Sequence, residues 1–202
     1  MNRIRTVCVF CGSSSGAKPE HMEDATSLGR ALAEAGVGLV YGGGNIGLMG
    51  AVARATLTAG GHVTGVIPRF LVEREVMLAD VHELVVTEDM HERKRVMFDR
   101  SDAFVALPGG IGTLEELVEQ MTWAQLGRHE KPILVANLHD FWTPLLTLLE
   151  HMSSEGFLRP GLEAPHVVAT RVEDILPTLE AALPFVQDLA DDAEPVAPVE
   201  QL

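Results

Sequence analysis

The chain has 202 residues, of which 47% are hydrophobic and 22% charged, a composition typical of a folded globular protein. Its 29 acidic and 15 basic side chains give a formal net charge of −14. This charge argues against duplex DNA or an anionic membrane as the main partner, because neutralising phosphates requires basic patches. It does not exclude one small anionic ligand in a local pocket.

Apolar runs of strand length alternate with amphipathic segments of helix length. The first kind predicts strands over residues 6–11, 37–41, 62–67, 84–87, 103–107, 133–136 and 166–169. The second predicts helices over residues 21–35, 47–59, 89–101, 113–126, 141–155 and 172–183. Repeated strand–helix–strand units with continuous apolar strands predict an α/β fold, a doubly wound parallel sheet with helices on both faces.

The two ends of the chain differ in character. Residues 1–183 are expected to form a single domain, and residues 184–202 an acidic, disordered tail. Eight acidic side chains follow Arg171, the last basic residue, and the final stretch DLADDAEPVAPVEQL shows no periodicity. A solvated terminus is the preferred interpretation, and a docking arm is the alternative.

The sequence predicts a cytoplasmic protein. The basic start MNRIR precedes an apolar run too short for a secretory signal, and the longest uncharged run, residues 35–53, contains seven glycines. Cys8 and Cys11 form a C-x-x-C motif inside a predicted strand, where positions three apart face opposite sides of a sheet. Two buried reduced thiols are therefore expected rather than a redox pair.

Segments rich in glycine and serine follow three predicted strands: CGSSSG at 11–16, GGGNIGLMG at 42–50 and PGGIGT at 108–113. Ligands bind at the carboxyl ends of the strands in open parallel sheets, and small residues let backbone amides approach them closely. The second and third segments open into helices, whose amino ends favour an anion. A phosphate site is the natural expectation.

The glycine spacing of the second segment permits another interpretation. Gly42, Gly44 and Gly47 match the dinucleotide pattern G-x-G-x-x-G, but that pattern belongs after the first strand. Arg69, which follows the third strand, would suit a 2′-phosphate, so an NADP site stays open, as does a purely structural role in helix–sheet packing. The sequence contains no G-x-x-x-x-G-K-[ST], which excludes a P-loop ATPase or kinase.

The PGGIGTLEE segment carries the sharper prediction. The amides of Gly110–Thr113 and the Thr113 hydroxyl would cradle a phosphate at a helix start. Thr113 and Glu116 also have the spacing of a capping box, which would give Glu116 a purely structural role. Against this, Glu115 and Glu116 form a carboxylate pair beside an anion site. A carboxylate near a ribose phosphate could stabilise an oxocarbenium-like centre or orient water.

The segment MHERKRVMFDR supplies cations. On a helix, Met90 and Met97 share a face with Arg93 or Lys94, and a base in an apolar stripe either snorkels or points into a site. Arg93 is favoured for the site, because its guanidinium suits a phosphate, a carboxylate or a developing charge. Glu75, in VEREV, has no role on local sequence alone. The eight histidines show no clustered ligand spacing, so a metal site is unsupported.

Together these motifs resemble the LOG family of cytokinin riboside 5′-monophosphate phosphoribohydrolases, once labelled possible lysine decarboxylases. The resemblance covers about residues 4–183 and is carried by CVFCGSS, VYGGGNIGLMG, GVIP, MHERK, PGGIGTLEE and TWAQLG. The old decarboxylase label fails on chemistry, because pyridoxal phosphate needs a Schiff-base lysine. The chain has only Lys18, Lys94 and Lys131.

The resemblance implies a Rossmann-like fold, a homodimer, no cofactor and hydrolysis of a nucleoside monophosphate to free base and ribose 5-phosphate. Its catalytic pair falls on Arg93 and Glu116. The implied substrate-binding set, with the pocket-wall residues added from the glycine and serine segments, is Ser13, Gly43, Gly44, Glu75, Arg93, Lys94, Gly109, Gly110, Ile111, Gly112, Thr113, Leu114, Glu115, Glu116 and Thr122.

Two alternatives stay open. A related hydrolase could act mainly on ordinary nucleotides such as AMP, and the same scaffold could be a non-catalytic carrier of a nucleotide or phosphorylated cofactor. The Arg93 and Glu116 pair argues against a carrier, which would not require it. A polynucleotide partner and a membrane are not expected.

Overall fold

The computed structural model describes residues 3–72, 77–158 and 166–191. Its strands are β1 (Thr6–Phe10), β2 (Gly38–Tyr41), β3 (Val63–Pro68), β4 (Glu83–Thr87), β5 (Ala103–Ala106), β6 (Ile133–Ala136) and β7 (Val167–Ala169). Its helices are α1 (Glu20–Glu34), α2 (Gly47–Thr58), α3 (Arg69–Val72), α4 (Met90–Asp99), α5 (Ile111–Gln125), α6 (Thr143–Ser154) and α7 (Ile175–Asp191), with 3₁₀ turns η1 (Leu138–Asp140) and η2 (Val172–Asp174).

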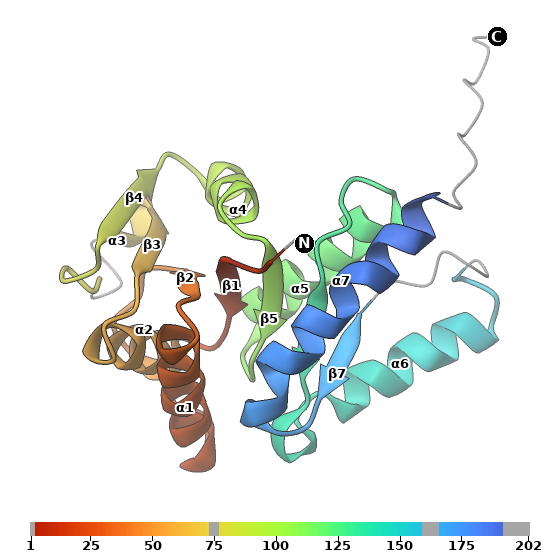
Figure 1. The fold of residues 1–202 in the computed structure, drawn as a ribbon, viewed down its shortest axis with the longest axis horizontal. Coiled ribbons are helices and arrows are strands. Elements are labelled where there is room, and N and C mark those ends of the chain that lie inside the picture. The colour runs from red at the N-terminus through yellow and green to blue at the C-terminus, as the bar shows by residue number, and fades with distance from the viewer. Residues whose placement is uncertain (1–2, 73–76, 159–165, 192–202) are drawn as a thin grey trace, which may run out of the picture.

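The strands form one sheet in the order β4-β3-β2-β1-β5-β6-β7, and every neighbouring pair is parallel (Figure 1). Each predicted strand forms, with its ends shifted by at most one residue. The predicted doubly wound α/β fold is confirmed. Among the described residues, no helix is both long and apolar enough to cross a membrane.

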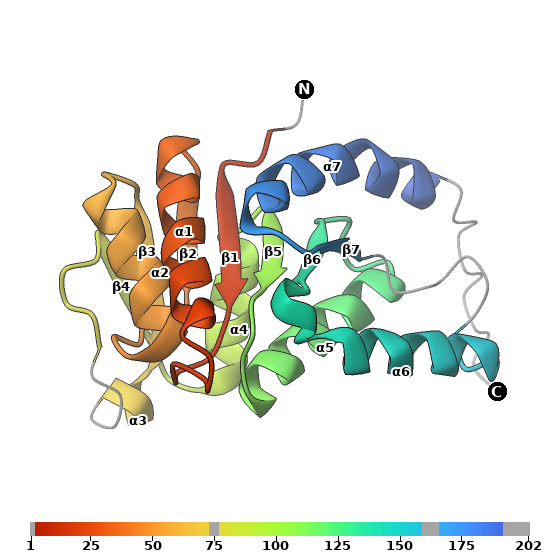
Figure 2. The same cartoon turned by 90° about the horizontal axis from the view of Figure 1, so that it is seen from below.

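Two apolar cores lie on opposite faces of the sheet. Leu28, Val52 and Leu179 bring α1, α2 and α7 onto one face, while Met97 and Leu117 bring α4 and α5 onto the other. Leu145 and Leu149 of α6 pack against the second core. Figure 2 shows α7 and α6 on opposite sides of β6 and β7.

The two cysteines divide between these cores. Cys8 belongs to the core under α4, α5 and α6, and Cys11 to the core under α1, α2 and α7. Both are buried free thiols, and burial raises the pKa of each thiol well above its ordinary value. The expectation of two buried thiols on opposite sides of the sheet is confirmed.

The helices differ from the predictions in several places, and three of these differences are the most informative. The single turn α3 was not predicted, because four residues carry no periodicity. Helix α5 begins at Ile111 and not at Thr113, since extended Gly110 (φ −91°, ψ −160°) serves as its N-cap. Helix α7 runs past Leu183 to Asp191, so its last two turns occupy part of the predicted tail 184–202. Residues 192–202 lie outside the described residues.

The winding of the chain reverses between β1 and β5. From β1 the chain proceeds outward through β2, β3 and β4, and it returns to place β5 on the other side of β1. The loops that leave β1 and β5 therefore depart in opposite directions and open a crevice at the carboxyl edge. The Gly12 N–H donates to the Pro108 carbonyl oxygen at 3.0 Å, so the two loops touch at the base of this crevice.

Candidate active site

A cavity of about 280 Å³ occupies the crevice between β1 and β5. Segments from four separate parts of the chain line it: the β1 loop, the β2–α2 loop, the first turn of α4 and the start of α5. The lining residues are Val9, Cys11, Gly12, Ser13, Gly42, Met49, Met90, Arg93, Gly110, Ile111, Gly112, Thr113, Glu115 and Glu116.

The start of α5 presents backbone donors to this cavity. The first backbone hydrogen bond of the helix runs from the Leu114 N–H to the Gly110 carbonyl at 3.1 Å. The N–H groups of Ile111, Gly112 and Thr113 precede it and have no carbonyl one turn back to bond. Thr113 is buried, and a methyl group at Gly109 would come 2.1 Å from its hydroxyl oxygen. Gly109 thus lets the loop fold tightly over Thr113.

The capping-box interpretation of Thr113 and Glu116 is wrong. The N-cap of α5 is Gly110, which makes no side-chain capping bond, and Thr113 stands at the third helical position. The Glu116 side chain instead faces α4, where its Oε1 lies 3.2 Å from Arg93 Nη1. Its carboxylate is therefore directed at the cavity.

Arg93 is held from three directions. Its Nε donates to the Val66 carbonyl oxygen at 3.2 Å, its Nη1 lies 3.9 Å from Met90 Sδ, and the same Nη1 pairs with Glu116. The side chains of Arg93 and Glu116 are only 10% and 9% exposed. Asp89 caps α4 by accepting from the Glu92 N–H at 2.8 Å, which starts the helix one turn before Arg93.

Burial and charge oppose each other at Glu116. Removal from water raises the pKa of its carboxyl group, the Arg93 guanidinium lowers it, and Glu115 raises it again. Burial prevails, so the pKa stands above the ordinary value for a glutamate. A carboxylate of raised pKa beside a cation in a crevice is typical of a group that handles charge or protons.

Lys94 serves a different set of partners. Its Nζ donates to Glu115 Oε1 at 2.6 Å and to Glu119 Oε1 at 2.9 Å. Burial lowers the pKa of Lys94, but these two hydrogen bonds outweigh it and leave the pKa raised. The ammonium neutralises α5 carboxylates next to the cavity and does not line the cavity itself.

The remaining predicted residues differ in where they lie relative to the cavity. Ser13 lines the cavity, whereas Thr122 is exposed and its hydroxyl donates to the Val118 carbonyl of its own helix at 2.8 Å. Leu114 packs against the core under α5. Glu75 lies outside the described residues.

Gly43 and Gly44 lie just behind the cavity wall. Gly44 pairs with Met77 in an antiparallel bridge, and the Gly43 carbonyl accepts from the Leu78 N–H at 3.2 Å. The neighbouring Gly42 reaches the cavity instead. A Cβ at Gly42 would lie 2.2 Å from Arg93 Nη2, so only a glycine leaves room for the guanidinium.

Several lining residues were missed by the sequence analysis. Val9, Cys11 and Met49 are apolar and belong to strand and helix patterns that signal core packing. Gly12 and Met90 stood inside the quoted motifs without an assigned role. The available signals were the position after a predicted strand for Gly12 and a helix face shared with Arg93 for Met90.

The NADP alternative loses support from the geometry. Arg69, the residue proposed for a 2′-phosphate, is exposed and pairs with Glu88 at 3.0 Å, away from the cavity lining. Within the described ranges, no group of three or more histidine, cysteine or acidic residues is arranged to hold a metal ion.

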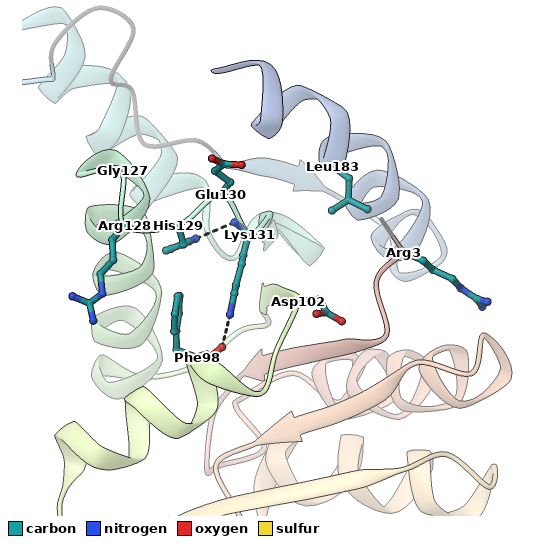
Figure 3. Close-up of a pocket in the computed structure, with 9 residues that line it drawn as sticks. All are labelled: Arg3, Phe98, Asp102, Gly127, Arg128, His129, Glu130, Lys131 and Leu183. Atoms are coloured by element: carbon teal, nitrogen blue, oxygen red, sulfur yellow. Dashed lines mark hydrogen bonds between the residues drawn. The ribbon is translucent and has the colours of Figure 1, made fainter. Parts of the chain in front are cut away.

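A larger cavity, about 570 Å³, lies at the opposite, amino-terminal edge of the sheet (Figure 3). Two of its charged groups, Lys131 and Asp102, already have structural partners. Lys131 Nζ donates to the Phe98 carbonyl oxygen at 2.7 Å, and Asp102 accepts from the Arg5 and Thr6 N–H groups. Figure 3 shows the side chains of Arg3 and Arg128 pointing away from the other labelled residues. The crevice between β1 and β5 is therefore the candidate site.

The fold and the site define a doubly wound α/β protein with a helix amino end and a buried Arg–Glu pair beside the cavity at its switch point. The family model described as possible lysine decarboxylase matches residues 49–179. A cytokinin riboside 5′-monophosphate phosphoribohydrolase of Arabidopsis thaliana is 46% identical over 188 residues, 93% of this chain and 87% of that protein. One of Oryza sativa subsp. japonica is 45% identical over 183 residues, 91% of this chain and 76% of that protein.

The chain therefore belongs to the LOG family of cytokinin riboside 5′-monophosphate phosphoribohydrolases, and the resemblance seen in the sequence is confirmed. The molybdenum cofactor carrier protein of Chlamydomonas reinhardtii shares the fold, with a TM-score of 0.67 and 21% identity over 90% of this chain and 99% of that one. At this identity the likeness concerns the fold alone.

The described lining of the cavity does not fit the decarboxylase description of the family model. Among the described residues that line the cavity, none is a lysine. Lys94 is engaged by two glutamates, and Lys131 lies at the other edge of the sheet, 3.8 Å from the centre of the Phe98 ring. A Schiff base with pyridoxal phosphate has no amine to form on here.

Proposed function

We propose that this protein hydrolyses the N-glycosidic bond of a nucleoside 5′-monophosphate, with cytokinin nucleotides as the preferred class, and releases free base and ribose 5-phosphate. The buried Arg93–Glu116 pair at the wall of the switch-point cavity carries this proposal. It places a carboxylate and a guanidinium beside a helix amino end that suits a phosphate. The names of the relatives, at 44–46% identity over most of the chain, support the same reaction.

The 5′-phosphate binds at the start of α5. The N–H groups of Ile111–Thr113 and the Thr113 hydroxyl donate to its oxygens, and Ser13 completes the wall on the β1 side. Binding energy from this non-reacting phosphate holds the ribose in place for cleavage. Met49, Met90 and the exposed Ile111 give the base an apolar surface.

Glu116 and Arg93 act on the glycosidic bond. The Glu116 carboxylate stabilises the positive charge that develops at the anomeric carbon and takes a proton from the attacking water. The water oxygen bonds to the anomeric carbon while the bond from this carbon to the base nitrogen breaks. The electron pair of the broken bond leaves with the base. The proton that Glu116 took from the water is then passed to the departing base, which leaves the base neutral and Glu116 ionised again. Arg93 holds Glu116 in place and stabilises the negative charge on the leaving group.

Other residues of the predicted site belong to the same proposal. Lys94 holds Glu115 beside the substrate, so that Glu115 can accept hydrogen bonds from ribose hydroxyls. Glu75 belongs to this proposal through the family resemblance alone. Thr122 and Leu114 support α5 from within the helix and the core.

The test is incubation of the purified protein with AMP and with N6-isopentenyl-AMP, followed by chromatography for free base and assay of ribose 5-phosphate. Equal amounts of the two products are expected, with higher kcat/KM for the isopentenyl substrate. Preference for AMP would assign the enzyme to ordinary nucleotides. Retention of intact nucleotide would show a carrier and end the hydrolase proposal.

We also propose a homodimer in the cytoplasm. Large apolar side chains are exposed on and just after α5 and α6, which cover the same face of the sheet: Val118, Leu126, Leu148, Met152 and Phe157. A second copy is the occupant that the family resemblance implies for such a surface. Light scattering should give twice the chain mass, and Leu148→Asp should shift it toward one chain mass. A single-chain mass for the unmodified protein would contradict the dimer.

The proposed cytoplasmic location is supported by the two buried free thiols, which agree with a reducing compartment.

A further inference from the structure

The loop between β2 and α2 is tied to its own helix by an arginine. Arg54 Nη1 donates to the backbone carbonyl oxygen of Asn45 at 2.6 Å and to its side-chain Oδ1 at 2.5 Å. Both acceptors belong to one residue, so the guanidinium fixes the backbone and the side chain of Asn45 together. Because the donor is charged, these are stronger bonds than neutral ones.

Gly50 provides the space that this arrangement needs. A Cβ at Gly50 would lie 2.0 Å from the Asn45 carbonyl oxygen and 2.7 Å from Arg54 Nη1. Gly50 and Arg54 are four residues apart in α2 and so lie on the same helix face. The Asn45 carbonyl thus rests on the bare backbone of α2 at Gly50, and Arg54 holds it there from the next turn.

The same loop forms one wall of the candidate site. Asn45 stands between Gly42, which lines the cavity against Arg93, and Gly47, which contacts the β1 loop. At Gly47, φ is +58° and a Cβ would lie 2.4 Å from the Ser13 carbonyl carbon. Ser13 lines the cavity from the other side. A displacement of Asn45 would therefore be passed to both walls.

We propose that Arg54 is a positioning residue for the nucleotide site. Its bonds to Asn45 hold the β2–α2 loop against the Ser13 backbone and so set the spacing between Gly42 and Ser13. Arg54 itself is exposed and lies outside the cavity lining, so it acts only through Asn45. The kinetic part of this inference rests on the proposed hydrolase function.

The decisive variant is Arg54→Met, which keeps an unbranched side chain of similar helix propensity but removes every donor. We expect KM for AMP to rise about five- to tenfold, the loss of roughly one net hydrogen bond. The value of kcat should stay within about twofold, because a loosened wall weakens binding of substrate and transition state alike. Arg54→Lys keeps a single ammonium donor group and should give an intermediate KM.

Arg30→Met is the matched control. Arg30 is an exposed arginine of α1 that lines the same groove between α1 and α2 as Arg54. Its loss removes the same surface charge without touching the loop, so KM should not change. An equal rise in KM in both variants would assign the effect to charge and overturn the proposal.

Two further measurements separate positioning from general destabilisation. In a double-mutant cycle, Asn45→Ala combined with Arg54→Met should raise KM no more than the larger single effect, whereas additive effects would contradict the coupling. Backbone amides of residues 43–47 should exchange hydrogen faster in Arg54→Met, with the rest of the core unchanged. Unchanged exchange would overturn the proposal whatever the turnover. If the unmodified protein releases no base, the proposed function fails instead, and amide exchange alone decides the role of Arg54.

Discussion

Arg93 and Glu116 face each other across the wall of the switch-point cavity, with Nη1 and Oε1 3.2 Å apart and each side chain about nine-tenths buried. They come from α4 and α5, which reach this place through separate strand–helix units. A buried pair of this kind adds little net stability against an apolar replacement. Its position beside the first turn of α5 is the observation on which the proposed catalytic role rests.

Glu116→Gln removes the charge of this carboxylate but keeps its shape. If the carboxylate stabilises the oxocarbenium-like centre and accepts the proton from water, kcat should fall by about 10²–10⁴-fold. The measurement is release of base from AMP under saturating substrate, with circular dichroism to show that the fold is kept. Glu34→Gln, at the exposed end of α1, is the control and should keep full turnover. Full turnover of Glu116→Gln would mean that Glu116 is only structural.

Arg93→Met leaves the Glu116 carboxylate buried without its cation. Such a loss is expected to cost about 3–5 kcal/mol of unfolding free energy near pH 7. The double variant Arg93→Met/Glu116→Leu, which removes both charges, should recover most of it. Denaturant unfolding of the three proteins measures this, and a double variant as unstable as the single one would contradict the explanation by charge.

The cost in Arg93→Met should depend on pH in a defined direction. A raised pKa means that folded Glu116 holds its proton more tightly than the unfolded chain does. Protonation of folded Glu116 therefore contributes to the free energy of unfolding. This contribution is fully present below the unfolded pKa of about 4.3 and is lost as the pH rises through the folded pKa. Unfolding curves at pH 4 and pH 7 should show the smaller cost at pH 4.

The pH profile of kcat/KM should report the same carboxyl group. Since the ionised form acts, activity should fall on the acid side at a pKa above the ordinary value of about 4.3. Glu115 raises the pKa of Glu116, so Glu115→Gln should move this limb to lower pH. An unmoved limb in Glu115→Gln would show that another group controls the profile.

Gly42→Ala tests the space kept for the guanidinium. The added methyl group would meet Arg93 Nη2 at 2.2 Å and Met49 Sδ at 2.9 Å, so the Arg93 guanidinium must shift from its place beside Glu116. We expect kcat/KM to fall about 10²-fold, the effect of a misplaced catalytic group. At Gly38 the nearest atom to an added methyl would be 3.6 Å away, and Gly38→Ala should keep activity within about twofold. Equal activities of the two variants would contradict the close approach.

The local pattern of the chain was enough to place its elements. All seven predicted strands form within one residue of their expected ends, because a buried parallel strand is a continuous apolar run that can be recognised in isolation. The site edge followed from the same pattern, since the glycine and serine segments come directly after the strands. The ends of α5 and α7 and the turn α3 were harder, because helix ends depend on caps and packing rather than on periodicity.

Arg93 and Lys94 show the limit of what a local sequence pattern can predict. The two cations are adjacent on one helix, and their sequence neighbours do not separate a group aimed at the cavity from one engaged by Glu115 and Glu119. Likewise, Glu116 has the spacing of a capping box, and only the extended Gly110 shows that the helix begins earlier. The direction in which a side chain points from a helix surface is set by the helix that packs against that surface.

The amino-acid order alone determined the alternation of strands and helices, the parallel doubly wound sheet and the family to which the chain belongs, and it pointed to the carboxyl edge as the place of the candidate site. Only the tertiary structure decided which side chains meet there: Glu116 with Arg93, Lys94 with Glu115 and Glu119, and Arg54 with Asn45. Periodicity is a property of consecutive residues and can be read along the chain. Contacts between α4 and α5, or between a loop and the next turn of its helix, depend on how packed elements are rotated against one another, which no local pattern records.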